Sequence, residues 1–339
     1  MITKNKKSKS ADIIVGLDIG SYSVKSVVVV LTKDGIEVQR FVDAPLSQDK
    51  RIEDVLSAMD LSSYKHVRTA VSGPSVIIRR IKMPLMTPAE LKGAIRFEAE
   101  AHIPFPIDDC VLDYQVLSQD AQKKEMSIIL VAAKKEFVDA RYKTLSDLKI
   151  FPEMIDLDIF CLINAFESLN SEKIDKCYAL LNIGHKMSSF AIIQDGQPFF
   201  VREIARGGYQ VTKALAALKA IPEDQADQLK IVKSAEDAEA LKSATKTGFE
   251  SLSEEIRNSV DFAESEIGEG VSKIYLSGGG ALALDAAAYL TQEIGRSVQL
   301  WDNTAKMSFS EGLDQKLISG RWAELNVVLG MALRGMAKK

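Results

Sequence analysis

The sequence predicts an α/β protein built from two related halves, each of which begins with a strand, a glycine turn and a second strand. Residues 16–25 (GLDIGSYSVK) form the first such unit, and residues 181–190 (LNIGHKMSSF) repeat it. Both units are followed by an apolar run and an Asp-Gly pair, at 34–35 and 195–196, that is typical of a hairpin. A third glycine turn, at 278–280, lies between an apolar run and a helix-like stretch. Two matching units in one chain indicate a duplicated domain.

The first glycine turn brings together groups that suit an anion. Gly20 permits a backbone conformation that a side chain would resist, and adjacent backbone N–H groups in a concave turn bind phosphate. Ser21 and Ser23 add hydroxyl groups, Lys25 adds a positive charge, and Asp18 adds a carboxylate. Because a carboxylate that faces a phosphate usually needs a cation between them, the turn predicts phosphate with Mg2+. Taken alone, an ordinary hairpin with a surface aspartate explains it equally well.

Composition favours an ordinary globular protein. The 339 residues are 46% hydrophobic and 27% charged with a net charge of −4, which argues against disorder and against nucleic-acid binding. The longest apolar run, residues 128–133, is far shorter than the roughly 20 residues that span a bilayer. The basic stretch 1–10 is not followed by an apolar segment, so we expect a flexible tail rather than a signal peptide.

The cysteines and histidines show no metal-ligand spacing, and an odd number of cysteines fits a reducing compartment. We therefore expect no metal site among them and a soluble, cytoplasmic protein. These residues are Cys110, Cys161, Cys177, His66, His102 and His185.

In the first half, apolar spacing predicts alternating strands and helices. Thr87, Pro88 and Glu90 match a capping box with proline at the first helical position, so a helix should begin there and end before Pro104. This helix and its neighbours form an α+β unit that looks inserted. The expected strands are 13–15, 27–31, 36–41, 67–71, 75–83, 113–117 and 127–133, and the expected helices 52–59, 88–101, 136–148 and 155–169.

In the second half, Ser251 and Glu254 match a capping box, which predicts a long helix from there to residue 267. The charged residues 234–246 before it are expected to form a solvated helix or a loop. The other expected strands are 199–204, 273–276 and 298–301, and the other expected helices 209–219, 223–232, 285–294 and 322–333.

The domain organisation follows from this order. We expect a first domain at 11–175, with the inserted α+β subdomain at about 75–150. A second domain at 176–320 should contain a smaller subdomain at about 206–268, and a C-terminal helix at 321–339 should pack back on the first domain. The two domains should enclose a cleft.

Three motifs together resemble those of one ATP-binding superfamily, which contains actin, the actin-like heat-shock chaperones and FtsA. Residues 17–25 and 181–184 are similar to its two phosphate motifs, and residues 276–281 to its adenosine motif. Within it, residues 13–335 resemble the PilM family of type IV pilus assembly proteins. The closer likeness lies in MPLM (83–86), IRFEAE (95–100), IPFPID (103–108), DYQVL (113–117), DGQP (195–198), IARGG (204–208) and EIRNSVDF (255–262).

The resemblance implies an actin-like ATPase fold of two duplicated RNase H-like domains, with the inserted α+β subdomain in the first and a smaller subdomain of helices and strands in the second. It also implies roles for single residues. Asp18 would hold Mg2+ through water, while Gly20, Ser21, Ser23 and Lys25 would contact the phosphates of ATP or ADP.

The second domain would close on the nucleotide from the other side. Asp227 and Lys230, in the segment ADQLK (226–230), resemble a motif that reaches ribose or adenine. An exposed ion pair three residues apart, worth a few tenths of a kcal/mol, explains these two residues equally well. The other second-domain residues implied at the phosphates and the adenosine are Gly184, His185, Lys186, Gly278, Gly279 and Gly280.

Asn182 departs from the family pattern, because the second phosphate motif usually carries aspartate. An amide adds no charge to hold Mg2+ and accepts no proton. We therefore expect nucleotide binding with slow or absent hydrolysis, the nucleotide serving to hold the two domains together. Asp156 and Asp158, near the start of the helix expected at 155–169, are candidates for the missing acid.

The resemblance implies a cytoplasmic protein at the inner face of the inner membrane. It would bind the N-terminal cytoplasmic peptide of a PilN-like bitopic membrane protein and link pilus alignment proteins and the assembly motor to the machine. The resemblance implies that the peptide groove is a cleft between the first domain and the inserted subdomain, near residues 75–150. Residues 103–107 either line this groove or belong to the subdomain core.

Two other classes of function stay open. A filament-forming division protein similar to FtsA would end in an amphipathic membrane helix, whereas residues 327–336 are small, apolar and broken by glycine. A sugar or acetate kinase would need a catalytic acid and a polar substrate pocket, for which no separate signature is present. Pelleting with nucleotide would favour the first, and phosphorylation of a metabolite the second.

Overall fold

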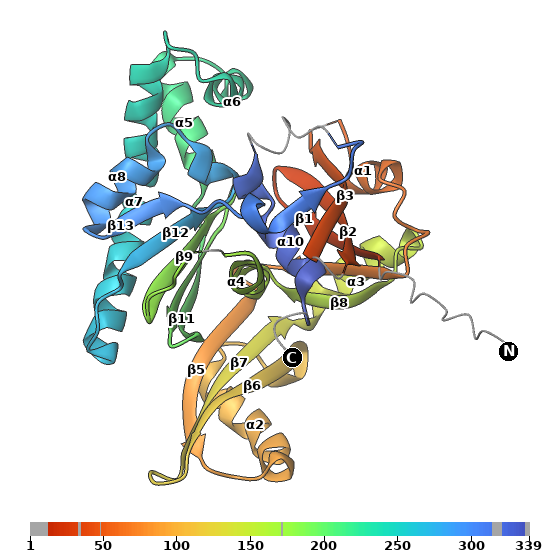
Figure 1. Ribbon diagram of the computed structural model, residues 1–339, viewed down its shortest axis with the longest axis vertical. Coiled ribbons are helices and arrows are strands. Elements are labelled where there is room, and N and C mark those ends of the chain that lie inside the picture. Colours follow the sequence, from red (N-terminus) through yellow and green to blue (C-terminus); the bar gives the residue numbers. More distant parts are fainter. Residues whose placement is uncertain (1–12, 33–34, 48, 171, 314–320, 336–339) are drawn as a thin grey trace, which may run out of the picture.

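Two α/β lobes lie side by side in the computed structural model, and a third, smaller layer projects from one end (Figure 1). The structure describes residues 13–32, 35–47, 49–170, 172–313 and 321–335. The basic stretch 1–10 and Asp34 of the first expected hairpin lie outside the described residues.

The two large sheets repeat one topology. In the described part of the chain, the first has the strand order β14-β3-β2-β1-β4-β8 and the second the order β11-β10-β9-β12-β13. In each sheet an antiparallel meander (β1 to β3, or β9 to β11) is continued by two parallel strands. The strands of the first sheet are β1 (Ile13–Ile19), β2 (Ser23–Thr32), β3 (Gly35–Pro45), β4 (His66–Val71), β8 (Pro152–Leu157) and β14 (Met307–Phe309). Those of the second are β9 (Cys177–Ile183), β10 (Ser188–Gln194), β11 (Gln197–Ile204), β12 (Lys273–Ser277) and β13 (Ser297–Leu300).

The glycine turns of the two lobes match in detail. Gly20 N–H donates to the Ser23 carbonyl at 3.1 Å, and Gly184 N–H donates to the Met187 carbonyl at 2.9 Å. The repeated topology and these equivalent turns support the duplication that the sequence predicts. The mixed α/β class is confirmed, whereas the exact domain boundaries stay a prediction; β14 lies within the range 176–320 but pairs with β3 of the first sheet.

Helices α4 (Asp158–Leu169) and α10 (Asn326–Leu333) fill the space between the two large sheets, and their apolar side chains share one core with both (Figure 1). The approach is close, because a Cβ on Gly330 would lie 1.7 Å from the Cys161 carbonyl oxygen. Helices α1 (Ile52–Ala58) and α3 (Lys135–Asp147) belong to the first lobe, and α5 (Gly208–Lys219), α6 (Glu223–Val232), α7 (Ala238–Ile267) and α8 (Ala286–Ile294) to the second.

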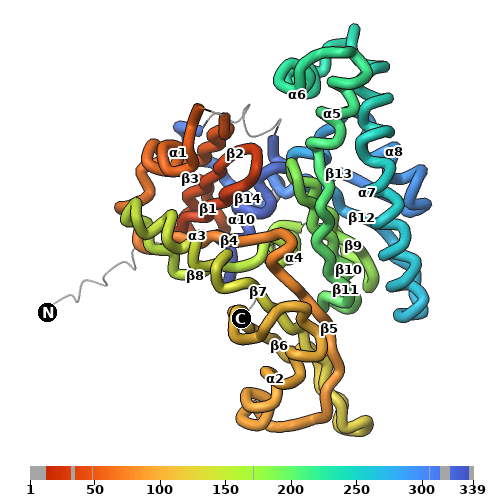
Figure 2. The backbone as a smooth tube through the Cα atoms, turned by 180° about the vertical axis from the view of Figure 1, so that it is seen from behind, coloured from red at the N-terminus to blue at the C-terminus, as the bar shows by residue number. Residues whose placement is uncertain are grey.

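The third layer is a small sheet in the order β5-β7-β6, with α2 against one face. Its elements are β5 (Val76–Pro84), α2 (Pro88–His102), β6 (Cys110–Asp120) and β7 (Glu125–Lys134). The predicted capping box of α2 is present, since Thr87 accepts from Glu90 N–H and Glu90 accepts from Thr87 N–H at 2.8 Å. Strand β5 lies beside β11, where the Arg80 guanidinium is 4.8 Å from the centre of the Phe199 ring (Figure 2).

Three predicted elements are wrong at their starts. Of the helix expected at 322–333, residues 322–324 form only a short 3-10 turn, and α10 begins at Asn326. Residues 152–157 form strand β8, so Asp156 lies within a strand and the helix begins at Asp158. Ile155 and Leu157 belong to the first sheet because they pair with β4. Helix α7 begins at Ala238, well before the expected cap at Ser251. It runs through the stretch expected to be solvated because Ala244 and other residues there are buried.

Candidate functional site

A continuous cleft lies where the glycine turns of the two lobes meet. It consists of two adjoining cavities, of about 300 Å3 (the first cavity) and about 370 Å3 (the second cavity). The residues that line both are Tyr22, Lys25, Gly184, His185, Gly279 and Glu324. An elongated ligand that reaches from one cavity into the other therefore fits the shape.

The structure brings nearly all of the sequence-predicted site residues to this cleft. Lys186 does not line it; its ammonium lies 5.9 Å from the centre of the Tyr209 ring. The predicted residues of the first cavity are Asp18, Gly20, Ser21, Ser23, Lys25, Gly184, His185, Gly278 and Gly279. Those of the second cavity, beyond the shared ones, are Asp227, Lys230 and Gly280.

The cleft also contains residues that the sequence reasoning missed. Tyr22 lies inside the first motif but carries no obvious phosphate chemistry, so it was not assigned. The other missed residues, apart from Ser189 in the second glycine unit, come from elements outside the glycine motifs, whose local sequence gives no signal for this site. They are Ser72, Arg141 and Ser189 in the first cavity, Lys233 and Arg321 in the second, and Glu324 in both.

Three carboxyl groups line the first cavity, those of Asp18, Asp158 and Glu324, and the last of these is paired with Arg321. Asp18 stands opposite Lys25 in the β1–β2 register, and burial raises its pKa against the opposing charges of Lys25 and Arg141. Asp158, at the start of α4, accepts a 2.6 Å hydrogen bond from Ser72 Oγ. Burial and the charge of Asp18 raise the pKa of Asp158 to about 6. Asp18 and Asp158 would both ionise more readily beside a cation.

The donors of the first cavity fit phosphate and Mg2+. Within the described residues, no group of three or more metal-ligating side chains is present, which excludes an all-protein cage there. Mg2+ is typically held by one or two carboxylates together with phosphates and water, and Asp18 and Asp158 supply that number. Two buried atoms, Ser23 Oγ and Arg141 Nη1, have no hydrogen-bond partner among the described residues. Buried polar atoms normally have such a partner, and the oxygen atoms of a phosphate could accept hydrogen bonds from both.

The triple glycine lies tightly against the end of β9. Gly278 has a φ of +91°, and a Cβ there would be 2.4 Å from the Ile183 carbonyl oxygen. A Cβ on Gly280 would be 2.4 Å from Ile183 Cγ2. Asn182, on the same strand end, lines the first cavity and accepts a long hydrogen bond from Ser277 Oγ at 3.4 Å. The glycines therefore let backbone, rather than side chains, form this wall.

Asp227 and Lys230 are not an exposed ion pair, because their side chains are only 16% and 18% exposed. Lys230 Nζ lies 2.7 Å from Asp227 Oδ1, to which Thr212 Oγ1 also donates at 3.2 Å. Tyr22 donates to the other carboxylate oxygen. Burial opposes ionisation of Asp227, but these donors hold its pKa below the ordinary value.

Tyr22, His185 and Tyr209 form a row of rings, of which Tyr22 and His185 line the cleft. The ring centroid of His185 lies 5.2 Å from that of Tyr22 and 5.1 Å from that of Tyr209. Burial, with the nearby charge of Lys230, lowers the pKa of His185 to about 4. At neutral pH this imidazole is therefore uncharged, and it can act on a phosphate as a hydrogen-bond donor but not as a cation.

The turn before α5 is hydrogen-bonded to the second glycine turn. Gly208 N–H donates to the Gly184 carbonyl and Tyr209 N–H to the His185 carbonyl, both at 2.8 Å. A Cβ on Gly207 would lie 2.5 Å from each of these two carbonyl oxygens. Gly207 is thus required by this close approach of two backbones.

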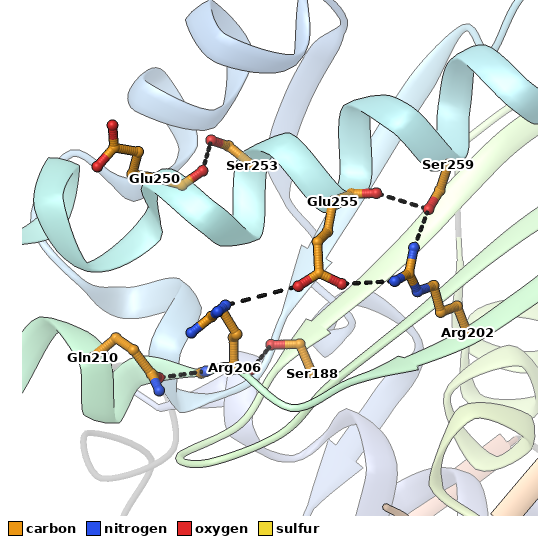
Figure 3. Close-up of polar contacts among 9 residues, drawn as sticks. Ser188, Arg202, Arg206, Gln210, Glu250, Ser253, Glu255 and Ser259 are labelled. Atoms are coloured by element: carbon orange, nitrogen blue, oxygen red, sulfur yellow. Dashed lines mark hydrogen bonds and ion pairs between the residues drawn. The ribbon is translucent and has the colours of Figure 1, made fainter. Parts of the chain in front are cut away.

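Polar contacts from α7 and β10 hold this turn in place (Figure 3). Glu255 accepts from Arg202 Nη2 at 2.8 Å, and its other oxygen lies 3.7 Å from Arg206 Nε. Ser188 Oγ donates to the Arg206 carbonyl at 2.7 Å. The motifs IARGG and EIRNSVDF, far apart in the sequence, therefore meet behind the second glycine turn.

Comparison with known proteins adds two findings. The family model described as type IV pilus assembly protein PilM matches residues 16–336. A solved PilM-PilN type IV pilus biogenesis complex is similar in fold, with a TM-score of 0.81 and 24% identity over 96% of this chain and 99% of that chain. Ethanolamine utilization protein EutJ from Carboxydothermus hydrogenoformans is similar with a TM-score of 0.52 and 13% identity over 95% and 90% of the two chains.

Proposed function

Because this chain belongs to the type IV pilus assembly protein PilM family and has an actin-like ATPase fold, we propose that it is a nucleotide-binding scaffold of the pilus assembly platform. The observation that carries the proposal is the joint cleft, in which glycine turns from both lobes surround Asp18 and Lys25. In this proposal ATP or ADP binds there with Mg2+.

The two cavities divide the nucleotide between them. The second cavity, with Asp227, Lys230 and the backbone at Gly280, would hold the adenosine. The first cavity would hold the phosphates and the metal ion, with Asp18 on the metal side and Lys25 at the junction. A ligand that contacts both lobes binds the closed arrangement and therefore stabilises it.

Hydrolysis is proposed to be slow or absent. Asn182 adds no charge at the end of β9, where a carboxylate would help to hold Mg2+. Asp158 is the better candidate for a replacement acid, because it lines the first cavity; Asp156 does not, and its carboxylate lies 3.0 Å from Arg334 Nη1. A positioned acid alone supplies only part of the stabilisation that phosphoryl transfer needs.

The proposed partner is the N-terminal peptide of a PilN-like membrane protein, bound near residues 75–150. Supporting it is the solved PilM-PilN complex, which has a similar fold. Ile103 and Ile107 are buried in the core of the third layer, which supports the core interpretation of 103–107.

Within the described residues no helix is both long and apolar enough to cross a bilayer. We propose a location at the cytoplasmic face of the inner membrane through this partner, with contacts to motor or platform proteins.

Isothermal titration calorimetry with ATP and ADP, with and without Mg2+, tests the nucleotide proposal. We expect binding of both, weakened in the Asp18→Asn variant when Mg2+ is present. Folded protein that gives no heat with either nucleotide would refute it. A pulldown with a synthetic N-terminal peptide of a neighbouring bitopic protein tests the partner separately, with a scrambled peptide as its control.

A further inference from the structure

Arg141 lies on α3 in the first lobe, outside every motif that marks the nucleotide site. Its side chain lines the first cavity, and its Nη2 donates to the Ile19 carbonyl at 3.3 Å, just before the first glycine turn. Burial lowers the pKa of this guanidinium, while the charges of Asp158 and Asp18 oppose that shift. Arg141 is therefore a largely buried cation that interacts with the charges of Asp18 and Asp158.

The guanidinium has unused donor capacity. Arginine carries five N–H donors, and Nη1 of Arg141 is buried without a hydrogen-bond partner among the described residues. Leaving a buried charged donor unsatisfied is costly, and such atoms are rare unless a ligand or ion completes them. A guanidinium fork is also the side chain best suited to phosphate oxygens.

The position of Arg141 along the cleft indicates which phosphate it reaches. A nucleotide whose base occupies the second cavity passes its first phosphates through the shared residues, such as Lys25 and Gly279. The far end of the chain then enters the part of the first cavity that the second does not share. Two of the described lysines and arginines line the first cavity. Lys25 also lines the second cavity, whereas Arg141 does not.

We propose that Arg141 contacts the terminal phosphate of a bound nucleoside triphosphate and so distinguishes the triphosphate from the diphosphate. This rests on the proposed nucleotide site. Helix α3 follows directly on β7, the central strand of the third layer, and contacts both β6 and β7. Helix α3 therefore links the residue that contacts the terminal phosphate to the third layer, which we propose as the peptide-binding region.

Calorimetric titration of ATP and ADP with Mg2+ into wild type, Arg141→Gln and Arg141→Lys tests the proposal. Because hydrogen bonds to charged groups are strong, Arg141→Gln should lose at least about tenfold in ATP affinity and less than about threefold in ADP affinity. Arg141→Lys, which keeps the charge but not the fork, should fall between. Lys143→Ala, on the exposed side of the same helix, should bind both as wild type does.

Equal losses for ATP and ADP, or no loss, would overturn the inference and leave Arg141 as a counter-ion of Asp18 and Asp158. If Arg141→Gln does not fold, Arg141→Lys decides by the same ratio. Wild-type protein that binds neither nucleotide is a different outcome, because it removes the nucleotide site itself. Circular dichroism of each variant shows whether the fold is retained.

Discussion

The hydroxyl of Tyr22 donates a 2.8 Å hydrogen bond to Oδ2 of Asp227, 205 residues later in the chain. Tyr22 lies in the first glycine turn of one lobe, and Asp227 on α6 of the other. The Tyr22 ring also lies against His185 of the second glycine turn. One side chain thus joins the two turns and the proposed adenosine site across the cleft.

Tyr22→Phe should loosen the closed arrangement of the lobes without changing the fold. The variant keeps the ring contact with His185 but loses a hydrogen bond to a carboxylate, for which we expect a loss of about 1 to 2 kcal/mol in the free energy of unfolding. Urea denaturation followed by circular dichroism measures it. Tyr142→Phe is the control, because that side chain is 47% exposed on α3. Equal midpoints for the two variants would contradict the prediction.

Gly280→Ala should destabilise the protein by about 1 to 3 kcal/mol, because the new Cβ would overlap Ile183 and force the wall of the cleft to shift. Gly93→Ala is a control of opposite sign. No atom lies within 4 Å of a Cβ at Gly93, inside α2, and alanine there should stabilise the helix by about 0.5 to 1 kcal/mol. Thermal unfolding of both variants checks the two signs, and a stable Gly280→Ala protein would show that the wall is not tightly packed.

Asn182→Asp should increase ATP hydrolysis if the missing carboxylate limits it. The new carboxylate would stand at the end of β9, beside the first cavity, where it would help to hold Mg2+. The metal ion neutralises charge that develops on the phosphoryl oxygens, and such stabilisation is commonly worth at least about tenfold in rate. Phosphate release measures the change. Asn258→Asp, on the exposed side of α7, adds the same charge away from the cleft and should have no effect. An unchanged rate in Asn182→Asp would show that the missing carboxylate does not limit ATP hydrolysis.

Local signals account for the parts of the fold that the sequence predicts well. The capping box at Thr87 acts within four residues, and the repeated turns at Gly20 and Gly184 are set by their own backbone, so both are present as expected. Strand β8 depends instead on pairing with β4, and the early start of α7 depends on burial against α5. Such long-range contacts override local preference and leave no pattern in a short window.

The same limit applies to the site. Residues within a glycine motif, such as Asp18 and Gly279, are predictable because the turn that recruits them is local. Arg141 and Glu324 reach the cleft from α3 and from the turn before α10, and only the folded topology brings them together. Lys186 is next to predicted residues in sequence, yet its side chain lies over Tyr209.

Glu203 is a buried carboxyl group near the first cavity. It lies on β11 and accepts a 3.1 Å hydrogen bond from Ser189 Oγ, which lines that cavity. Burial, with the negative charge of Asp158, raises the pKa of Glu203 to about 8, from an ordinary value of 4.5. The folded protein therefore keeps a proton that the unfolded chain has lost between these pH values.

Because Glu203 keeps its proton in the folded state through that window, its contribution to wild-type stability should fall as the pH rises from about 4.5 to about 8, by up to about 1.4 kcal/mol per pH unit. Glu203→Gln cannot ionise, so its advantage over wild type should grow through this window and become constant above it. Unfolding midpoints between pH 5 and 9 measure the difference. Glu100→Gln, on the exposed face of α2, should follow wild type throughout. Parallel curves for wild type and Glu203→Gln would show that Glu203 ionises equally easily in both states.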